Sequence, residues 1–241
     1  MVTAAIRADR VAEERVLVVE DVTISDTDDG HPVRMHGSIR ADTGDLIIIQ
    51  VADLHQAELW ADVASGVRRP SSGQVSILGN DLATLDDETR AWLRGRIGRV
   101  FSRGNWLDRL SLLDNILLAA RHHSERDEDD LKTKASALAA AFGLPGIPLG
   151  MPDGIDRIDL QRAACVRAFL GSPVLIILED PTYAAHEVML KPLVDVIRAA
   201  RDRGAAVMWF SPSLEIWRDR TIPATRRYQV AANELMEVEG H

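Results

Sequence analysis

The sequence predicts an α/β fold with a mostly parallel core sheet, flanking helices, an antiparallel β region near the N-terminus and a helical subdomain. Two solid apolar runs, residues 46–49 and 174–178, are typical of strands buried on both faces of a sheet. Helix-length segments separate the later strands, as in parallel βαβ units. The opening third instead carries short runs of β-branched residues with polar or glycine-containing turns between them.

The predicted elements of the opening third follow from these patterns. In order they are the strand 16–24, the polar turn 25–30, the extended stretch 33–39, the strand 46–51, the helix 56–63 and the strand 74–78.

The rest of the chain is predicted to be mainly helical with parallel strands between the helices. The helices are expected at 86–93, 111–121, 127–142, 159–170 and 187–203, the strands at 97–101, 174–178 and 205–210, and a final hairpin at 227–230 and 235–238. Residues 143–154 carry four glycines and three prolines and predict a loop between subdomains. We expect one domain over 1–241, in which 1–100 and 155–241 form the core and β region and 101–154 the helical subdomain.

Composition excludes several classes of partner. The formal net charge is −9, so attraction to nucleic acid backbones is not expected to drive binding. No apolar run approaches the roughly 20 residues that a membrane-spanning helix needs, so we expect no direct membrane insertion. Cys165 is the single cysteine and sits in an apolar run, which is typical of a small buried hydrophobe in a reducing compartment. The chain is expected to be cytoplasmic, or peripheral on a membrane through a partner.

Five segments, in order along nearly the whole chain, resemble the ATPase subunits of ABC transporters. Residues 174–182, ending Glu179-Asp180-Pro181-Thr182, resemble the Walker B strand, and residues 161–169 the helix behind the signature motif. The other three segments are 66–73, 97–101 and 110–116, which resemble the segment that follows the phosphate-binding helix, the strand before the Q-loop and the stretch after it. The spacing over 114–146 is most similar to the ATPase of Mla-type lipid transporters, with a generic importer or exporter subunit as the alternative.

The resemblance places the phosphate loop at residues 51–59, where the expected chemistry is missing. Such a loop needs glycines to expose backbone N–H groups, a lysine for the phosphate charge and a Ser or Thr for magnesium. Val51 and Gln56 stand at glycine positions, Ala57 at the lysine and Glu58 at the hydroxyl. Asp53 adds a further negative charge and is expected to cap the following helix itself. None of the chain's three lysines follows a glycine.

The other nucleotide motifs of the family are altered as well. The signature positions are occupied by Asp156, Arg157 and Asp159, and no two glycines are adjacent anywhere in the chain. The Q-loop glutamine corresponds to Ser102 and the switch histidine to Pro212. We interpret these positions as a degenerate signature, Q-loop and switch.

Glu179 and Asp180 are the carboxylates that remain at the Walker B positions, in the reverse of the family's order. In the family, the first of the two carboxylates positions magnesium through a water molecule, and the second carboxylate orients the attacking water. Without a lysine or a magnesium-binding hydroxyl we interpret them as vestigial. The sequence therefore predicts no bound cofactor and no metal, and the balance favours a protein that is not an enzyme.

A docking surface is expected on residues 102–109, which correspond to the groove that receives a helix of the membrane subunit in this family. Trp106 and Leu107 are the candidate anchors. The alternative is that Trp106 packs down onto the helical subdomain.

The expected function is that of a non-hydrolysing ATP-binding-cassette subunit of a lipid transporter, at the cytoplasmic side of a membrane permease. Its partners would be the permease and another ABC ATPase subunit, in a homo- or heterodimer. A divergent but active ATPase, and a scaffold or regulator that uses the fold without a permease, remain open as alternatives.

Overall fold

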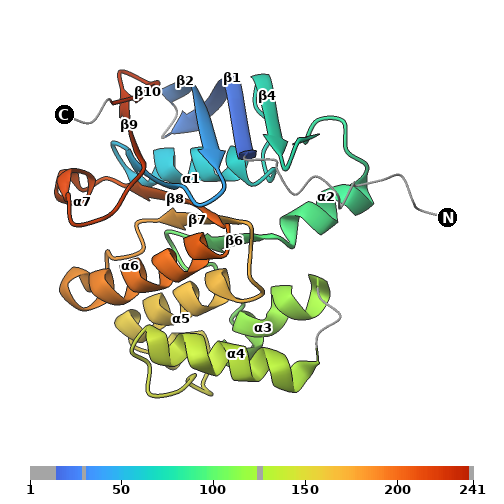
Figure 1. Ribbon diagram of the computed structural model, residues 1–241, viewed down its shortest axis with the longest axis vertical. Coiled ribbons are helices and arrows are strands. Elements are labelled where there is room, and N and C mark those ends of the chain that lie inside the picture. Colours follow the sequence, from blue (N-terminus) through green and yellow to red (C-terminus); the bar gives the residue numbers. More distant parts are fainter. Residues whose placement is uncertain (1–14, 29–30, 124–126, 239–241) are drawn as a thin grey trace.

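The computed structural model describes residues 15–28, 31–123 and 127–238, which form one ten-stranded sheet with helices on both faces (Figure 1). The strands are β1 (Arg15–Asp28), β2 (His31–Asp42), β3 (Leu46–Gln50), β4 (Ser72–Ile77), β5 (Asn80–Asp81), β6 (Ile97–Val100), β7 (Leu175–Glu179), β8 (Ala206–Ser211), β9 (Arg226–Ala231) and β10 (Glu234–Glu237). The helices are α1 (Leu54–Ala64), α2 (Asp87–Arg94), α3 (Leu112–His123), α4 (Glu128–Ala141), α5 (Arg157–Phe169), α6 (His186–Asp202) and α7 (Leu214–Arg218), with a 3₁₀ turn at Pro152–Gly154.

The sheet has a parallel half and a mainly antiparallel half. Its strand order is β5-β4-β1-β2-β10-β9-β3-β8-β7-β6. The run from β9 to β6 is parallel, whereas β1 pairs antiparallel with both β2 and β4. The predicted α/β fold, with a mostly parallel core and an antiparallel region near the N-terminus, is therefore confirmed, as is the C-terminal hairpin.

Strand β3 lies at the centre of the molecule and is buried on both faces, as its apolar run predicted. Ile47 and Ile49 face the cluster that contains α1, while Leu46 and Ile48 face the cluster beneath helices α3 to α6. All four side chains are fully buried, and each contributes roughly 1.5–3 kcal/mol through burial of apolar surface. The helix α1 begins just after β3, at its cap Asp53.

Helices α3, α4 and α5 gather at the end of the molecule opposite β1 and β2 (Figure 1). Phe142, just after α4, packs its ring 5.7 Å from that of Phe169 at the end of α5. Because α5 packs against α3 and α4 and also against β6, it joins the helical group to the sheet. The subdomain boundaries at 101 and 154 stay a prediction.

The predicted turn at 25–30 is wrong over its first residues, because β1 continues through Asp28. Ser25 pairs with Arg34 and Asp26 with Val33 in the β1–β2 ladder. A strand with one solvated face accepts such polar residues, so their composition resembled a turn. Residues 29–30 lie outside the described residues.

Two expectations about single features can be compared directly with the structure. Cys165 is buried, and burial raises the pKa of its thiol to about 12, which fits an inert apolar role. Within the described ranges, no helix combines the length and apolar character needed to cross a membrane.

Candidate functional site

The phosphate-loop, Walker B and switch positions that the resemblance assigns lie at the carboxyl ends of the parallel strands β3, β7 and β8. Gln50 of β3 pairs with Ser211 of β8, and Phe210 pairs with Glu179 of β7. Backbone hydrogen bonds connect the residues that follow these strands: the Val51 N–H donates to the Ser211 carbonyl at 3.2 Å, and the Asp180 N–H donates to the Phe210 carbonyl at 2.8 Å. In open α/β sheets this edge is the usual place for a ligand.

The N-terminus of α1 is closed by side chains of its own first turn. The Asp53 carboxylate accepts a hydrogen bond from the Gln56 N–H at 2.8 Å, and the Gln56 side-chain oxygen accepts one from the Ala52 N–H at 3.0 Å. Asp53 thus satisfies one of the donors that a helix start leaves free, and Gln56 reaches back to the N–H of the residue before the cap. The expectation that Asp53 caps the helix is confirmed.

Two positions of the assigned phosphate loop lie inside the core. Val51 and Ala57 are both fully buried and pack in the cluster around α1. A lysine at residue 57 would have to leave this cluster to meet a ligand. The Glu58 side chain, partly buried, lies close enough to Glu179 to act on its ionisation.

Arg99 on β6 is the residue that sequence reasoning missed, and it dominates the electrostatics of the site. Its Nε donates to Glu179 Oε1 at 2.6 Å, and its Nη1 donates to Asp62 Oδ1 on α1, also at 2.6 Å. Arg99 and Glu179 are almost completely buried. Glu179 also accepts the Ser102 N–H at 3.1 Å. An arginine inside the otherwise apolar strand 97–101 was the signal that could have found it.

The ionisation of Glu179 reflects these surroundings. Burial raises the pKa of the carboxyl above its ordinary value, against the opposing effects of the Arg99 charge and the Ser102 N–H. Both Glu179 oxygens already have donors, so the carboxylate is bound within the protein.

Asp180, the second carboxylate, has a different environment. It accepts a hydrogen bond from Ser211 Oγ at 3.1 Å, and burial raises the pKa of the carboxyl. Its backbone has a positive φ of 44°, a conformation that Asp tolerates better than bulkier residues. His186 lies near enough to lower that pKa, and its ring Nδ1 lies 3.5 Å from the Thr182 hydroxyl oxygen. Pro212 directly follows Ser211 and carries no titratable group.

The assigned signature positions form the start of α5. Asp156 caps this helix by accepting the Ile158 N–H at 2.8 Å, and Asp159 pairs with Arg162 at 3.0 Å. Arg157 is exposed and lies over the ring of Tyr183, 5.6 Å from its centroid. The N-termini of α1 and α5 therefore have the same arrangement, with an aspartate accepting a first-turn N–H group.

The candidate docking residues differ in exposure. Trp106 is half-buried, packs against the helical core and has the Arg167 guanidinium 4.3 Å from its ring centroid, as the packing alternative expected. Leu107 is 49% exposed, so it offers apolar surface. Asn115 holds the loop by accepting the Leu107 N–H at 2.8 Å and donating to the Leu107 carbonyl at 3.1 Å.

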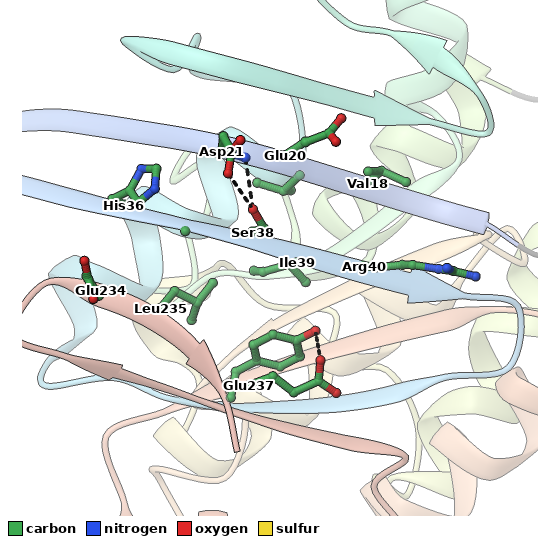
Figure 2. Close-up of a pocket in the computed structure, with 13 residues that line it drawn as sticks. Val18, Glu20, Asp21, His36, Ser38, Ile39, Arg40, Glu234, Leu235 and Glu237 are labelled. Atoms are coloured by element: carbon green, nitrogen blue, oxygen red, sulfur yellow. Dashed lines mark hydrogen bonds between the residues drawn. The ribbon is translucent and has the colours of Figure 1, made fainter. Parts of the chain in front are cut away.

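A separate groove of about 590 Å³ lies between β1, β2 and the β9–β10 hairpin (Figure 2). Its ordered polar contacts are internal: Tyr228 donates to Glu237 at 3.1 Å, and the Asp21 N–H donates to Ser38 at 3.0 Å. The described residues lining it include none of the assigned nucleotide positions. No group of three or more metal-ligating side chains occurs in the part of the chain that the structure describes.

Replacing Asp53 by Ala removes the carboxylate acceptor at the start of α1. We expect a loss of about 0.5–2 kcal/mol in the free energy of unfolding, measured by urea denaturation. Asp53→Asn keeps an acceptor and is expected to lose less. The capping role would be contradicted if Asp53→Ala lowered the free energy of unfolding no more than the control substitution Asp108→Ala, at an exposed aspartate, does.

Replacing Arg99 by Leu leaves Glu179 buried without its partner. At neutral pH we expect destabilisation of about 3–5 kcal/mol, and we expect Arg99→Leu/Glu179→Leu to recover most of it. Without Arg99 the folded-state pKa of Glu179 rises further above the unfolded value, so stability falls as pH rises between the two values and the penalty shrinks in acid. Guanidinium unfolding at pH 5 and pH 8 measures both effects. A loss that is equal at both pH values and unrelieved by the second substitution would contradict the pairing.

The fold and sequence were compared with known proteins. No family model matches the chain. In structure it is similar to the dimeric bacterial ABC transporter cassette MJ0796, with a TM-score of 0.80 and 16% sequence identity over 93% of this chain and 100% of that one. This likeness shows the fold.

Sequence relatives are more specific. The macrolide export ATP-binding/permease protein MacB of Rhodopseudomonas palustris is 28% identical to this chain over 58% of the chain's residues. The match covers only 22% of the length of that MacB protein. The lipoprotein-releasing system ATP-binding protein LolD 1 of Rhodopirellula baltica is 28% identical over 61% of this chain and 65% of its own. The ABC transporter ATP-binding protein YbbA of Escherichia coli K12 is 32% identical over 64% of this chain and 68% of its own. On this similarity, together with the fold, the chain belongs to the ATP-binding protein family of ABC transporters.

Proposed function

We propose that this chain is a non-hydrolysing member of its family, a subunit that keeps the fold and has lost the nucleotide chemistry. The observation that carries the proposal is the aspartate cap at the start of α1. Of the N–H groups around this helix start, that of Gln56 is already bonded to the Asp53 carboxylate and that of Ala52 to the Gln56 side chain.

Magnesium triphosphate does not fit the residues that surround the assigned loop. Asp53 and Glu58 place carboxylates where the ligand needs donors, and Ala57 offers no positive charge and is buried. Two like charges 4 Å apart repel by about 1 kcal/mol in water and about 4 kcal/mol at an effective dielectric constant near 20. A triphosphate carries several negative charges and multiplies this repulsion.

The Walker B position supports the same proposal. Glu179 is bonded to Arg99 and to the Ser102 N–H, so each of its oxygens already accepts a donor from within the protein. Arg99 supplies a positive charge at this carboxylate from within the protein. A divergent active ATPase would have to break this buried pair at some cost, which makes it the weaker alternative.

For partners, we propose a membrane permease and a second ABC ATPase subunit, with the chain held at the cytoplasmic side of the membrane. The relatives named for ATP-binding/permease proteins and the dimeric cassette structures support this assembly. Leu107 presents exposed apolar surface beside the half-buried Trp106, which suits a docking helix. A scaffold without a permease is the alternative.

For cargo, we propose a lipid-type substrate, as the Mla-like spacing suggested. One relative is named for lipoprotein release, while others are named for macrolide export, octopine permease and methionine import. The lipid proposal therefore rests on the sequence resemblance and the lipoprotein relative alone.

Magnesium ATP is expected to give no heat of binding in isothermal titration calorimetry and no change in the Tm of the protein. A ligand at one hundred times its dissociation constant would stabilise the fold by about 2.7 kcal/mol, so true binding would be visible as a rise in Tm. Saturable binding that Asp180→Asn weakens would contradict the proposal and favour the divergent ATPase.

Co-purification from the native host tests the membrane partner. We expect a tagged chain, extracted in mild detergent, to bring down a permease of a transporter, and Leu107→Glu to reduce its recovery at least several-fold. The matched control is Leu214→Glu on α7, because the native Leu214 side chain is similarly exposed, at 44%. Recovery of soluble proteins alone would favour the scaffold.

A further inference from the structure

A pocket of about 540 Å³ lies between the C-terminal end of α1, strand β4 and helix α2, which stands at the margin of the molecule (Figure 1). Its walls come from the loop between α1 and β4, from β4, from the residues that follow β5 and from α2. Pockets of this volume commonly hold small molecules. None of its described lining residues belongs to the assigned nucleotide positions or to the candidate docking loop 102–109.

The inner part of the pocket is apolar and closely packed. Val63 of α1 and Val75 of β4 are almost completely buried there. Leu82 packs against the backbone of Gly66, where a Cβ would come within 3.0 Å of a Leu82 methyl carbon. Val67, which is 62% exposed, adds apolar surface that water still reaches. The pocket can therefore cover an apolar group of a ligand.

Two of the arginines that line the pocket are held by groups outside it. Arg68 donates to Asp26 Oδ1 at 3.1 Å. Arg90 pairs with Asp87 at 3.2 Å and donates to the Leu85 carbonyl at 2.8 Å. These bonds fix one wall on the loop after α1 and another on α2, and each of the two charges already has an acid beside it.

The other charged groups of the lining leave one positive charge in excess. Arg69 and Arg94 are exposed and form no ion pair with a described residue. Asp81 is the one carboxylate among the described lining residues. Its oxygens accept hydrogen bonds from the Gln74 side chain at 3.0 Å and from the Ala83 N–H at 2.9 Å, so they are used within the turn after β5. Two unpaired arginines against one aspartate attract a single negative charge, although the chain as a whole carries −9.

Helix α2 has little apolar attachment to the rest of the molecule. Leu93 is the only one of its residues that is buried. Arg94 belongs to α2, whereas Arg69 belongs to the loop between α1 and β4. An anion bound by both arginines would therefore tie α2 to that loop.

We propose that this pocket binds a small organic acid, in which a single carboxylate is attached to an apolar body. The planar guanidinium groups of Arg69 and Arg94 match a carboxylate, which accepts two parallel hydrogen bonds from such a group. One negative charge balances the excess in the pocket, whereas a polyphosphate would exceed it. The apolar inner part covers the body of the ligand. The proposal does not rest on the proposed function, because it uses none of the nucleotide positions.

Calorimetric titration of the full chain with three probes tests the class of ligand. Naphthylacetate carries the acid on an apolar body, naphthylacetamide is its neutral counterpart, and acetate lacks the apolar body. We expect naphthylacetate to bind saturably and at least about tenfold more tightly than the other two, because one hydrogen bond to a charged group is worth roughly that factor. Raising the salt concentration should weaken naphthylacetate alone.

A pair of matched variants places the binding in this pocket. Arg69→Gln/Arg94→Gln should remove the preference for the acid over the amide. The control Arg34→Gln/Arg218→Gln replaces two exposed arginines elsewhere and should keep it. Because all four residues are exposed and outside the described ion pairs, both variants should unfold at the Tm of the native chain when no probe is present.

Equal affinity for the acid and the amide, no saturable binding of the acid, or a pocket variant that behaves like the control would overturn the proposal. Tighter binding of inorganic phosphate or pyrophosphate than of naphthylacetate would also overturn it and assign the pocket to phosphate compounds. No nucleotide is present in this assay. A negative result therefore counts against the pocket alone, while calorimetry with magnesium ATP and co-purification decide the proposed function.

Discussion

The buried ion pair between Arg99 and Glu179 is the interaction on which the rest of the site depends. It joins β6 to β7 and, through Asp62, joins both strands to α1. Because Glu179 is almost completely buried, its charge requires a partner inside the protein. An arginine of the same chain supplies that partner, so the charge of the carboxylate is balanced within the protein.

The helix starts follow the same principle. Four of the described helices, α1, α2, α4 and α5, begin with an aspartate that accepts a first-turn N–H group. At α2 and α4 this is ordinary helix capping, of the kind that stabilises surface helices. At α1 and α5 the same aspartate cap lies at a helix start to which the family resemblance assigns a phosphate. The loss of nucleotide chemistry, as proposed, therefore needs no unusual structure, only the local solution that the chain uses elsewhere.

These replacements are compatible with an intact fold because the core and the ligand positions are separate. The faces of β3, β7 and β8 remain apolar and fully buried, whatever stands at the strand ends. A subunit that must still pack against partners keeps this framework. The exposed Leu107 lies outside this framework.

The sequence by itself determined the α/β class, the order of most elements, the two-sided burial of β3 and the capping of α1 by Asp53. These depend on local periodicity and on contacts within one helical turn, which a single sequence displays directly. Tertiary structure alone decided the partner of Glu179, the burial of Ala57 within the core and the position of Trp106 beneath Arg167. Arg99 and Glu179 stand 80 residues apart, and they meet only because β6 and β7 are parallel neighbours. Pairing across a sheet is set by the topology of the whole chain, and no short-range pattern records it.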